Sequence, residues 1–196
     1  LLADMVSRET DVAASADYFA RMGATMASMH NQAIGWTPPA GFQRHKLDAD
    51  GLMGPEPFWG PFWDHAIFSP AERAMLLAVR DRLHAELSRY GKPARTFSLI
   101  HADLHSHNVL IDGADTTVID FDDAGFGWHQ YDLAVALVTY QDHPDFAVFR
   151  DACIAGYKSV RTISDADLEL LPMFMLIRDL AQIGWYHQRP ELDRAA

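Results

Sequence analysis

The chain has 196 residues, of which 49% are apolar and 22% are charged, and its formal net charge at pH 7 is −11. These proportions are typical of a globular domain and argue against wholesale disorder. The acidic balance disfavours duplex nucleic acid and anionic membrane surfaces as partners, because both require a dense basic patch.

Export and membrane insertion are not supported by the sequence. No apolar run reaches the roughly eighteen residues that a membrane span needs. The opening LLADMVSRETD lacks the basic start and apolar core of a signal peptide. The single cysteine, Cys153, cannot form an internal disulfide, which favours a reducing, cytoplasmic location. The chain begins with Leu instead of Met, so we expect a piece of a longer protein.

Residues 15–31 are predicted to form an amphipathic helix. Large apolar side chains recur there at spacings of three and four residues: Tyr18, Phe19, Met22, Met26 and Met29. A methionine stripe can form an adaptable binding surface, but packing into a core is its commoner use. We therefore expect this helix to pack against the core.

Residues 35–68 differ in character, because Pro and Gly interrupt regular structure there while aromatic side chains accumulate. The aromatic residues are Trp36, Phe42, Phe58, Trp59, Phe62 and Trp63. This composition predicts a long loop region that packs over the core or, as the second alternative, lines a ligand site.

The clearest helix signal covers residues 69–91. Ser69 is a candidate N-cap, Pro70 suits the first helical position, and Glu72 would complete a capping box. Gly91 is a plausible stop. The expected apolar face contains Met75, Leu76, Val79, Leu83 and Leu87.

A short β region is expected in the middle of the chain. Segments 96–101 and 116–121 are rich in β-branched and apolar residues, which predicts strands. The segment VLIDG at 109–113 predicts a hairpin that turns at Asp112 and Gly113.

Helical patterns return after residue 130, over 131–141, 144–160 and 171–187, and Ser164 with Asp167 gives a capping signal before the last helix. The predicted fold class is therefore α+β, a mostly helical body with a small central β-hairpin region.

The stretch HADLHSHN, residues 101–108, concentrates polar side chains at alternating positions: His101, Asp103, His105 and His107. On an extended segment all four would point to one face, and imidazoles with a carboxylate suit Zn²⁺, Mn²⁺ or Fe. The letters DLHSH also resemble a motif of the PHP-type metal-dependent phosphoesterases. Those barrels need further ligands from repeated strands downstream, however, and helices are predicted there instead.

A second interpretation places the weight on three oxygen-bearing side chains: Asp103, Asn108 five residues later, and Asp120 in VIDF. Phosphoryl transfer requires positioning and charge neutralisation more than covalent chemistry from the protein. One carboxylate orients the acceptor hydroxyl and takes its proton, while an amide and a second carboxylate hold Mg²⁺ against the nucleotide phosphates. The order and spacing match kinase-like catalytic loops. The alternative without a catalytic or metal-binding role is that the stretch 101–108 is a solvated polar turn.

The segments HADLHSHNVLIDG and VIDFDDAGFGWHQYDLA resemble the hallmark segments of the aminoglycoside phosphotransferase and choline kinase superfamily, which has a protein-kinase-like fold. The residue pattern of the second segment is most similar to the homoserine kinase-like, hydroxylysine kinase-like and stress-response kinase-like branch of this superfamily. The resemblance runs from residue 16 to about residue 186. It implies that residues 1–196 are a C-terminal lobe, with 96–132 as the catalytic and metal-binding segment.

By this resemblance, Asp103 is the catalytic base, and Asn108 and Asp120 bind the Mg²⁺ that accompanies ATP. His101 would brace the loop, and His105 would contact the loop or a phosphate. Asp132 would buttress the loop from the following helix.

Two departures from the family pattern are visible. Ala102 stands where the family usually has Gly, a change that a backbone with negative φ would tolerate. No Gly-rich phosphate loop and no V-A-I-K-like lysine precede residue 101, so the N-terminal nucleotide-binding lobe is expected to be absent from this chain. The isolated lobe is then expected to be inactive and to bind ATP weakly.

The resemblance implies an ATP-dependent phosphotransferase acting on a hydroxyl of a small molecule such as an amino alcohol, an amino acid or an aminoglycoside. A protein kinase of the same fold and a catalytically inactive binding domain are the alternatives. Four further residues are weaker candidates for the site: Asp122, Asp123, Arg178 and His187.

Overall fold

The first long helix, α1 (Val12–Gly35), begins after Asp11, whose side chain accepts hydrogen bonds from the backbone N–H groups of Ala13 and Ala14. In this computed structural model the described residues are 11–113, 115–189 and 191. Most of the opening segment, on which the signal-peptide prediction depends, lies outside them. Met22 and Met26 are fully buried, so the methionine stripe is part of the core, as predicted.

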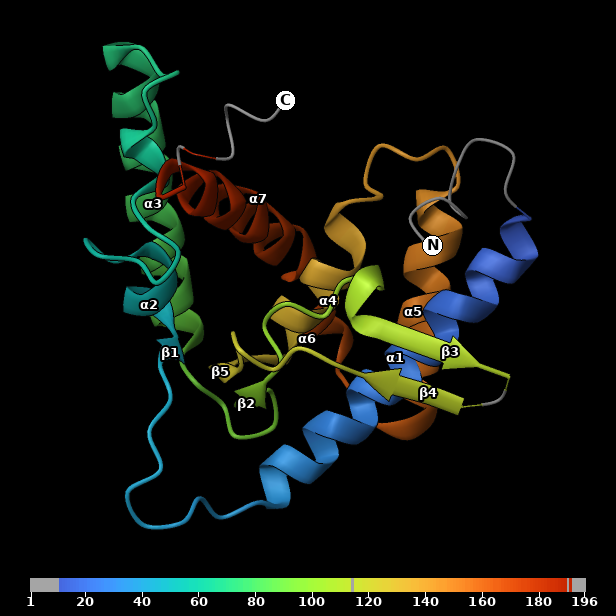
Figure 1. Ribbon diagram of the computed structural model, residues 1–196. Helices are drawn as coiled ribbons and strands as arrows, with labels where there is room; N and C mark the ends of the chain where they lie inside the picture. Colours follow the sequence, from blue (N-terminus) through green and yellow to red (C-terminus); the bar gives the residue numbers. More distant parts are fainter. Residues whose placement is uncertain (1–10, 114, 190, 192–196) are drawn as a thin grey trace.

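Helix α1 packs closely against α5 (Phe146–Val160) because two glycines remove side chains at the contact. A Cβ atom at Gly156 would collide with the carbonyl oxygen of Ala20, and one at Gly23 would collide with that of Cys153. The backbones therefore approach more closely than any larger residue would allow. In Figure 1 the two helices form the side of the molecule beneath the β-hairpin.

The region 35–68 is mostly irregular, with three short elements: β1 (Lys46–Leu47), α2 (Ala49–Met53) and the 3₁₀ helix η1 (Phe62–Asp64). Its aromatic residues divide into two groups. Trp59, Phe62 and Trp63 are buried in the core, whereas Trp36, Phe42 and Phe58 remain exposed.

Helix α3 (Pro70–Tyr90) has the predicted capping box. Ser69 accepts from the backbone N–H of Glu72, and the Glu72 carboxylate accepts from the backbone N–H of Ser69. Leu76, Leu83 and Leu87 are buried as expected. Met75 is 59% exposed, so its assignment to the apolar face was wrong. It immediately precedes Leu76, and successive residues on a helix point about 100° apart.

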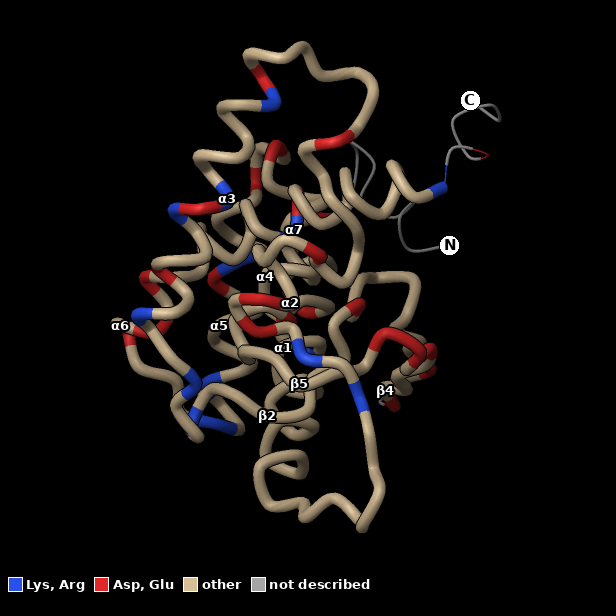
Figure 2. The backbone as a smooth tube through the Cα atoms, turned by 90° about the vertical axis from the view of Figure 1, so that its left-hand side faces the viewer, with Lys and Arg blue, Asp and Glu red and all other residues tan. Residues whose placement is uncertain are grey.

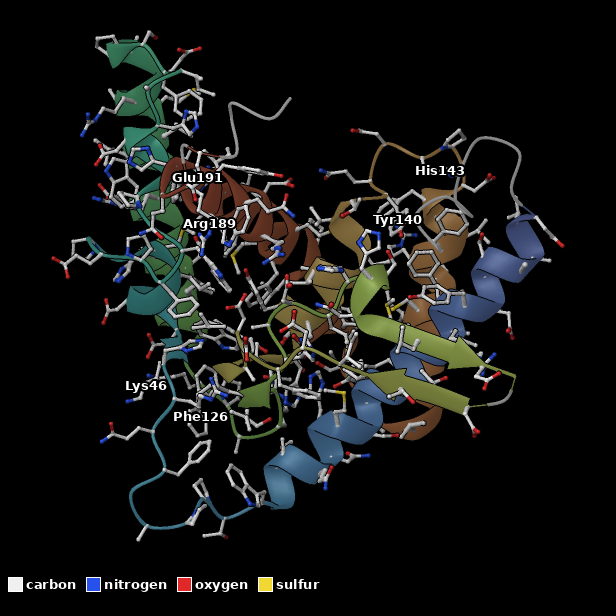
Figure 3. The ribbon with its side chains drawn as sticks, in the orientation of Figure 1. Lys46, Phe126, Tyr140, His143, Arg189 and Glu191 are labelled. Atoms are coloured by element: carbon white, nitrogen blue, oxygen red, sulfur yellow. The ribbon has the colours of Figure 1, made fainter. Side chains whose placement is uncertain are left out.

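Two small sheets lie in the middle of the chain. Strand β5 (Gly125–Trp128) pairs in parallel with β1 and antiparallel with β2 (Phe97–Ile100), and Figure 3 shows the paired residues Lys46 and Phe126 side by side. The predicted hairpin is formed by β3 (Val109–Asp112) and β4 (Asp115–Val118), with Gly113 at positive φ.

The hairpin is attached to α1 by a side-chain contact, because Nη2 of Arg21 donates to the carbonyl oxygen of Gly113 at 2.9 Å. Figure 1 shows the hairpin projecting beside the other elements instead of joining the three-stranded sheet.

Helix α4 (His129–Val138) is buried along its whole length and packs against α7 (Leu171–His187). Ser164 caps a single turn, α6 (Asp165–Leu168), and α7 begins separately three residues later. The α+β prediction is confirmed. None of the helices in the described part of the chain is both long and apolar enough to cross a membrane.

Candidate active site

The loop 101–108 connects β2 to β3 and ends in a 3₁₀ turn, η2 (Ser106–Asn108). Asp132, fully buried on α4, holds its first residues by accepting from the backbone N–H groups of His101 at 3.1 Å and Ala102 at 2.7 Å. The same carboxylate accepts from Nε2 of His30 at 3.0 Å. A buried carboxylate with three N–H donors is well satisfied, so it fixes where the loop begins. Asp132 therefore occupies the buttressing position that the resemblance implies.

Ala102 has φ of +69°, so the expectation of a negative φ at this position was wrong. An L-residue in this left-handed conformation costs about 1 kcal/mol or more relative to the right-handed one. The two hydrogen bonds from the loop backbone to Asp132 offset that cost. Gly adopts a positive φ without strain, which explains why it would be preferred at this position. Ala102 adopts the same backbone conformation at a cost in free energy.

His101 joins the loop to the strand that precedes Asp120. Its Nδ1 accepts from the backbone N–H of Asp103 at 3.3 Å, so Nε2 carries the proton and donates to the carbonyl oxygen of Ile119 at 3.0 Å. The N–H of Ile119 in turn donates to the carbonyl oxygen of Asn108 at 3.0 Å. Both backbone groups of Ile119 are therefore held by the loop, which places Asp120 next to it.

Asp103 is partly buried and lies among three donors. Nη2 of Arg178 donates to Oδ1 at 2.6 Å, while Nε2 of His105 and Nδ2 of Asn108 lie 3.2 and 3.3 Å from Oδ2. Burial acts to raise the pKa of Asp103, but the hydrogen bond from His105 and the charge of Arg178 outweigh it and lower that pKa below the ordinary carboxyl value. The carboxylate is thus held ionised, as a proton acceptor must be.

His105 has the geometry of a loop contact. Its Nδ1 accepts from the backbone N–H of His107 at 3.2 Å, so its Nε2 carries the proton that faces Asp103. His105 therefore supports Asp103 and caps η2 at the same time.

Asn108 and Asp120 fit a magnesium ion by the chemistry of their oxygens. The hydrogen bonds of the Asn108 side chain use Nδ2, which donates to Asp103, and the amide oxygen points the other way on the same planar group. Asp120 is exposed, with φ of +63°. Figure 2 shows acidic residues near β4, and Asp122 and Asp123 follow Asp120 closely in the sequence. Mg²⁺ commonly takes one or two protein oxygens and completes its shell with phosphate and water.

The histidine-metal interpretation has no geometric support in residues 11–113, 115–189 and 191. Within these ranges no three His, Cys, Asp or Glu side chains gather closely enough to hold a metal ion. His101 turns inward to Ile119 and is fully buried, while His105 turns to Asp103. The alternating positions therefore do not share one face, because the loop bends at Ala102.

A cavity of about 270 Å³ lies directly beside Asp103. Its walls contain Asp123 from the turn before β5 and Arg178 from α7, which were weaker candidates in the sequence. The other lining residues are Trp59, His105, Ala181, Gln182, Trp185 and Tyr186. Asp122 and His187 do not line it. A larger hollow of about 650 Å³ between α5, α6 and α7 contains none of the predicted site residues.

Two contributions to the site were not anticipated from the sequence. One is the pair Gln182 and Trp185, which follow the candidate Arg178 on α7 at spacings of four and three, so a periodicity search of α7 would have grouped them with it on one face.

The other is a buried pair of imidazoles beneath the loop. His30 and His129 stack with ring centroids 4.0 Å apart, and burial lowers the pKa of His129, which stays neutral.

The fold and this loop together define a protein of kinase-like fold with a phosphotransferase-type catalytic loop. Residues 3–168 match the model of the phosphotransferase enzyme family, and the chain belongs to that family. The family prediction is therefore confirmed.

Individual relatives agree with this assignment. The chain is 30% identical over 135 residues to the amicoumacin kinase of Bacillus subtilis (strain 168), covering 64% of this chain and 40% of that protein. It is 31% identical over 156 residues to the homoserine kinase of Acidiphilium cryptum (strain JF-5), covering 78% and 46%. The chain thus spans about half the length of the curated relatives it matches.

Solved structures show the same fold. The microcompartment-associated aminopropanol kinase superposes with a TM-score of 0.80 at 36% identity, covering 89% of this chain and 55% of that one. The amicoumacin kinase hAmiN, solved with AMP-PNP, Ca²⁺ and Ami, has a TM-score of 0.72 at 22% identity, covering 88% and 52%, and supports the fold.

Proposed function

We propose that the protein containing this chain transfers the γ-phosphoryl group of ATP to a hydroxyl group of a small molecule. The observation that carries the proposal is the arrangement of Asp103. It is an ionised carboxylate at the wall of a cavity, with the Asn108 amide bonded to it and Asp120 held nearby through Ile119. The relatives named above are kinases of small hydroxyl compounds, which supports the same activity.

In this proposal Asp103 is the catalytic base. An acceptor hydroxyl in the cavity donates its hydrogen bond to the carboxylate, which orients the oxygen and takes the proton as the phosphoryl group arrives. His105 and His101 act through Asp103 and Ile119 and keep the loop in shape. The cavity of about 270 Å³ is suited to a small acceptor such as an amino alcohol, an amino acid or part of an aminoglycoside.

Asn108 and Asp120 would hold Mg²⁺ in the complex with ATP. When bound, the ion would neutralise part of the phosphate charge. The protein's own contribution is to fix the two side chains relative to Asp103, through the Asn108–Asp103 and Asn108–Ile119 hydrogen bonds.

The chain serves as the C-terminal lobe in this proposal, and a second lobe supplies the other wall of the nucleotide site. The coverage of about half of each relative supports that division. ATP should then bind this chain alone at least about 100-fold more weakly than it binds the whole protein, as isothermal titration calorimetry would measure. Equal affinities would exclude the division. A cytoplasmic location fits the use of ATP and a single, buried thiol at Cys153.

The experiment is a phosphotransfer assay on the whole protein with MgATP and a panel of hydroxyl acceptors, comparing wild type with Asp103→Asn. That variant keeps the side-chain shape and removes the base, so kcat should fall about 100-fold to 10,000-fold. The matched control is Asp151→Asn, at a carboxylate whose side chain is 67% exposed on α5, and it should leave kcat unchanged. Undiminished turnover in Asp103→Asn would overturn the role of Asp103.

The same assay separates the alternative functions. Lack of turnover with every acceptor would favour an inactive binding domain, and turnover with a protein substrate alone would favour a protein kinase.

A further inference from the structure

Arg178 lies in an unusual place for an arginine, on the buried side of α7, and is only 8% exposed. Burying a guanidinium ion costs several kcal/mol unless a carboxylate compensates it. The compensating group is Asp103, whose Oδ1 lies 2.6 Å from Nη2. The two residues are 75 positions apart in the chain, so the pair joins the catalytic loop to α7 directly.

The guanidinium is also fixed from its other sides. The ring of Trp59 lies against it, with Cζ 5.7 Å from the ring centroid, and the fully buried Tyr131 is a further neighbour. Its Nε is buried without a hydrogen-bond partner among the described residues. Nη2 is committed to Asp103 and Nε faces the interior, so the carboxylate and the ring of Trp59 together fix the orientation of the guanidinium.

The two oxygens of Asp103 are therefore held unequally. Oδ1 makes the short, charge-assisted bond to Arg178, whereas Oδ2 has only the longer contacts at 3.2 Å to His105 and 3.3 Å to Asn108. When a hydroxyl group approaches, the contacts of Oδ2 therefore cost less free energy to break than the bond of Oδ1.

We infer that Arg178 is a positioning residue for Asp103: it holds Oδ1 so that Oδ2 faces the acceptor hydroxyl and receives its proton. The inference rests on the proposed function, because it assigns a role within that reaction. It also extends the site beyond the family match, which ends at residue 168, before α7 begins.

The kinetic test compares wild type, Arg178→Met and Arg178→Lys in the whole protein, with the acceptor that the wild type uses. Misplacing a catalytic group by about 1 Å can cost on the order of 100-fold, so kcat of Arg178→Met should fall by about that factor with the acceptor KM unchanged. Lysine can replace a single Nη2 contact, so Arg178→Lys should recover kcat to within about tenfold of wild type. The control is Arg89→Met, at an arginine whose side chain is 69% exposed on α3.

Each outcome of this comparison decides between roles. A raised acceptor KM at unchanged kcat in Arg178→Met would overturn the inference, because it would make Arg178 a substrate-binding group. A lowered melting temperature with unchanged kcat would also overturn it, because Arg178 would then act only in packing. An inactive wild type would instead contradict the proposed function and is recognised before any variant is made.

A second measurement does not depend on turnover or on the folding of the Arg178 variants. In NMR spectra of this chain, the Nη protons of Arg178 should exchange slowly, because the ion pair shields and binds them. Asp103→Asn should bring them into fast exchange while the signals of Trp59 persist. Nη signals that are identical in wild type and Asp103→Asn would show that Asp103 does not hold the guanidinium, and the inference would fail.

Discussion

Replacing Asp132 with asparagine should be among the most damaging isosteric changes available in this chain. The carboxylate is fully buried and accepts three N–H groups, from the backbone of His101 and Ala102 and from His30. An amide has one oxygen. In the better orientation of the new amide, its oxygen keeps the bonds that Oδ2 of Asp132 accepts from His30 and from the N–H of His101. The NH₂ group then faces the N–H of Ala102, which loses its acceptor.

The magnitude follows from those contacts. A buried N–H left without an acceptor costs about 1–3 kcal/mol, and each remaining bond loses about 1 kcal/mol when the acceptor loses its charge. The sum for Asp132→Asn is about 3–5 kcal/mol. Part of it appears as lost support for the strained backbone of Ala102.

Equilibrium unfolding in urea, followed by far-UV circular dichroism, measures this loss. With a slope of about 2 kcal/mol per molar, the midpoint should fall by about 1.5–2.5 M. Asp151→Asn, the exposed control, should stay within about 0.5 kcal/mol of wild type. A loss below about 1 kcal/mol in Asp132→Asn would refute the reasoning that this carboxylate supports the loop.

Two further predictions concern stability. Gly156→Ala should destabilise the chain by about 3 kcal/mol in the same urea assay, because the new methyl group meets the Ala20 carbonyl. Gly35→Ala at the open end of α1 should be neutral or stabilise by up to about 1 kcal/mol, and equal effects at the two glycines would contradict the close contact between the helices. The buried carboxyl of Asp167 has its pKa lowered from 3.8 to about 2, since bonds from Arg95, Ser164 and Tyr90 outweigh burial, which raises it. Its contribution is therefore complete above about pH 4 and is lost as the pH falls through 2, so wild type should lose about 2 kcal/mol relative to Asp167→Asn between pH 5 and pH 2. Parallel pH profiles of the two proteins would exclude this contribution.

The parts of the structure that could be predicted from the sequence are those with local causes. The capping box of α3 uses residues three apart, and the hairpin turn depends on Asp112 and Gly113 in sequence. The spacing between Asp103 and Asn108 is also local, and the structure joins the two residues directly. Their catalytic and metal-binding roles remain predictions.

The parts that could not be predicted depend on contacts between distant segments. The pairing of Arg178 with Asp103 requires α7 to lie behind the loop, and no local pattern reports that. The positive φ of Ala102 is stable only because Asp132, thirty residues later, accepts the adjacent N–H groups. The stacking of His30 on His129 likewise depends on how α1 meets α4. Each is a tertiary interaction that overrides or supplements local preference.

The double attachment of Ile119 has a consequence for how the hairpin can vary. The bonds from Ile119 to Asn108 and His101 lie at the base of β3 and β4, and they set the alignment of the strands there. At the far end, the tip meets α1 through Arg21 and takes no part in the cavity. A peptide tag or a fluorescent reporter inserted at the tip would therefore disturb the Arg21 contact but leave the alignment at the base of the hairpin unchanged.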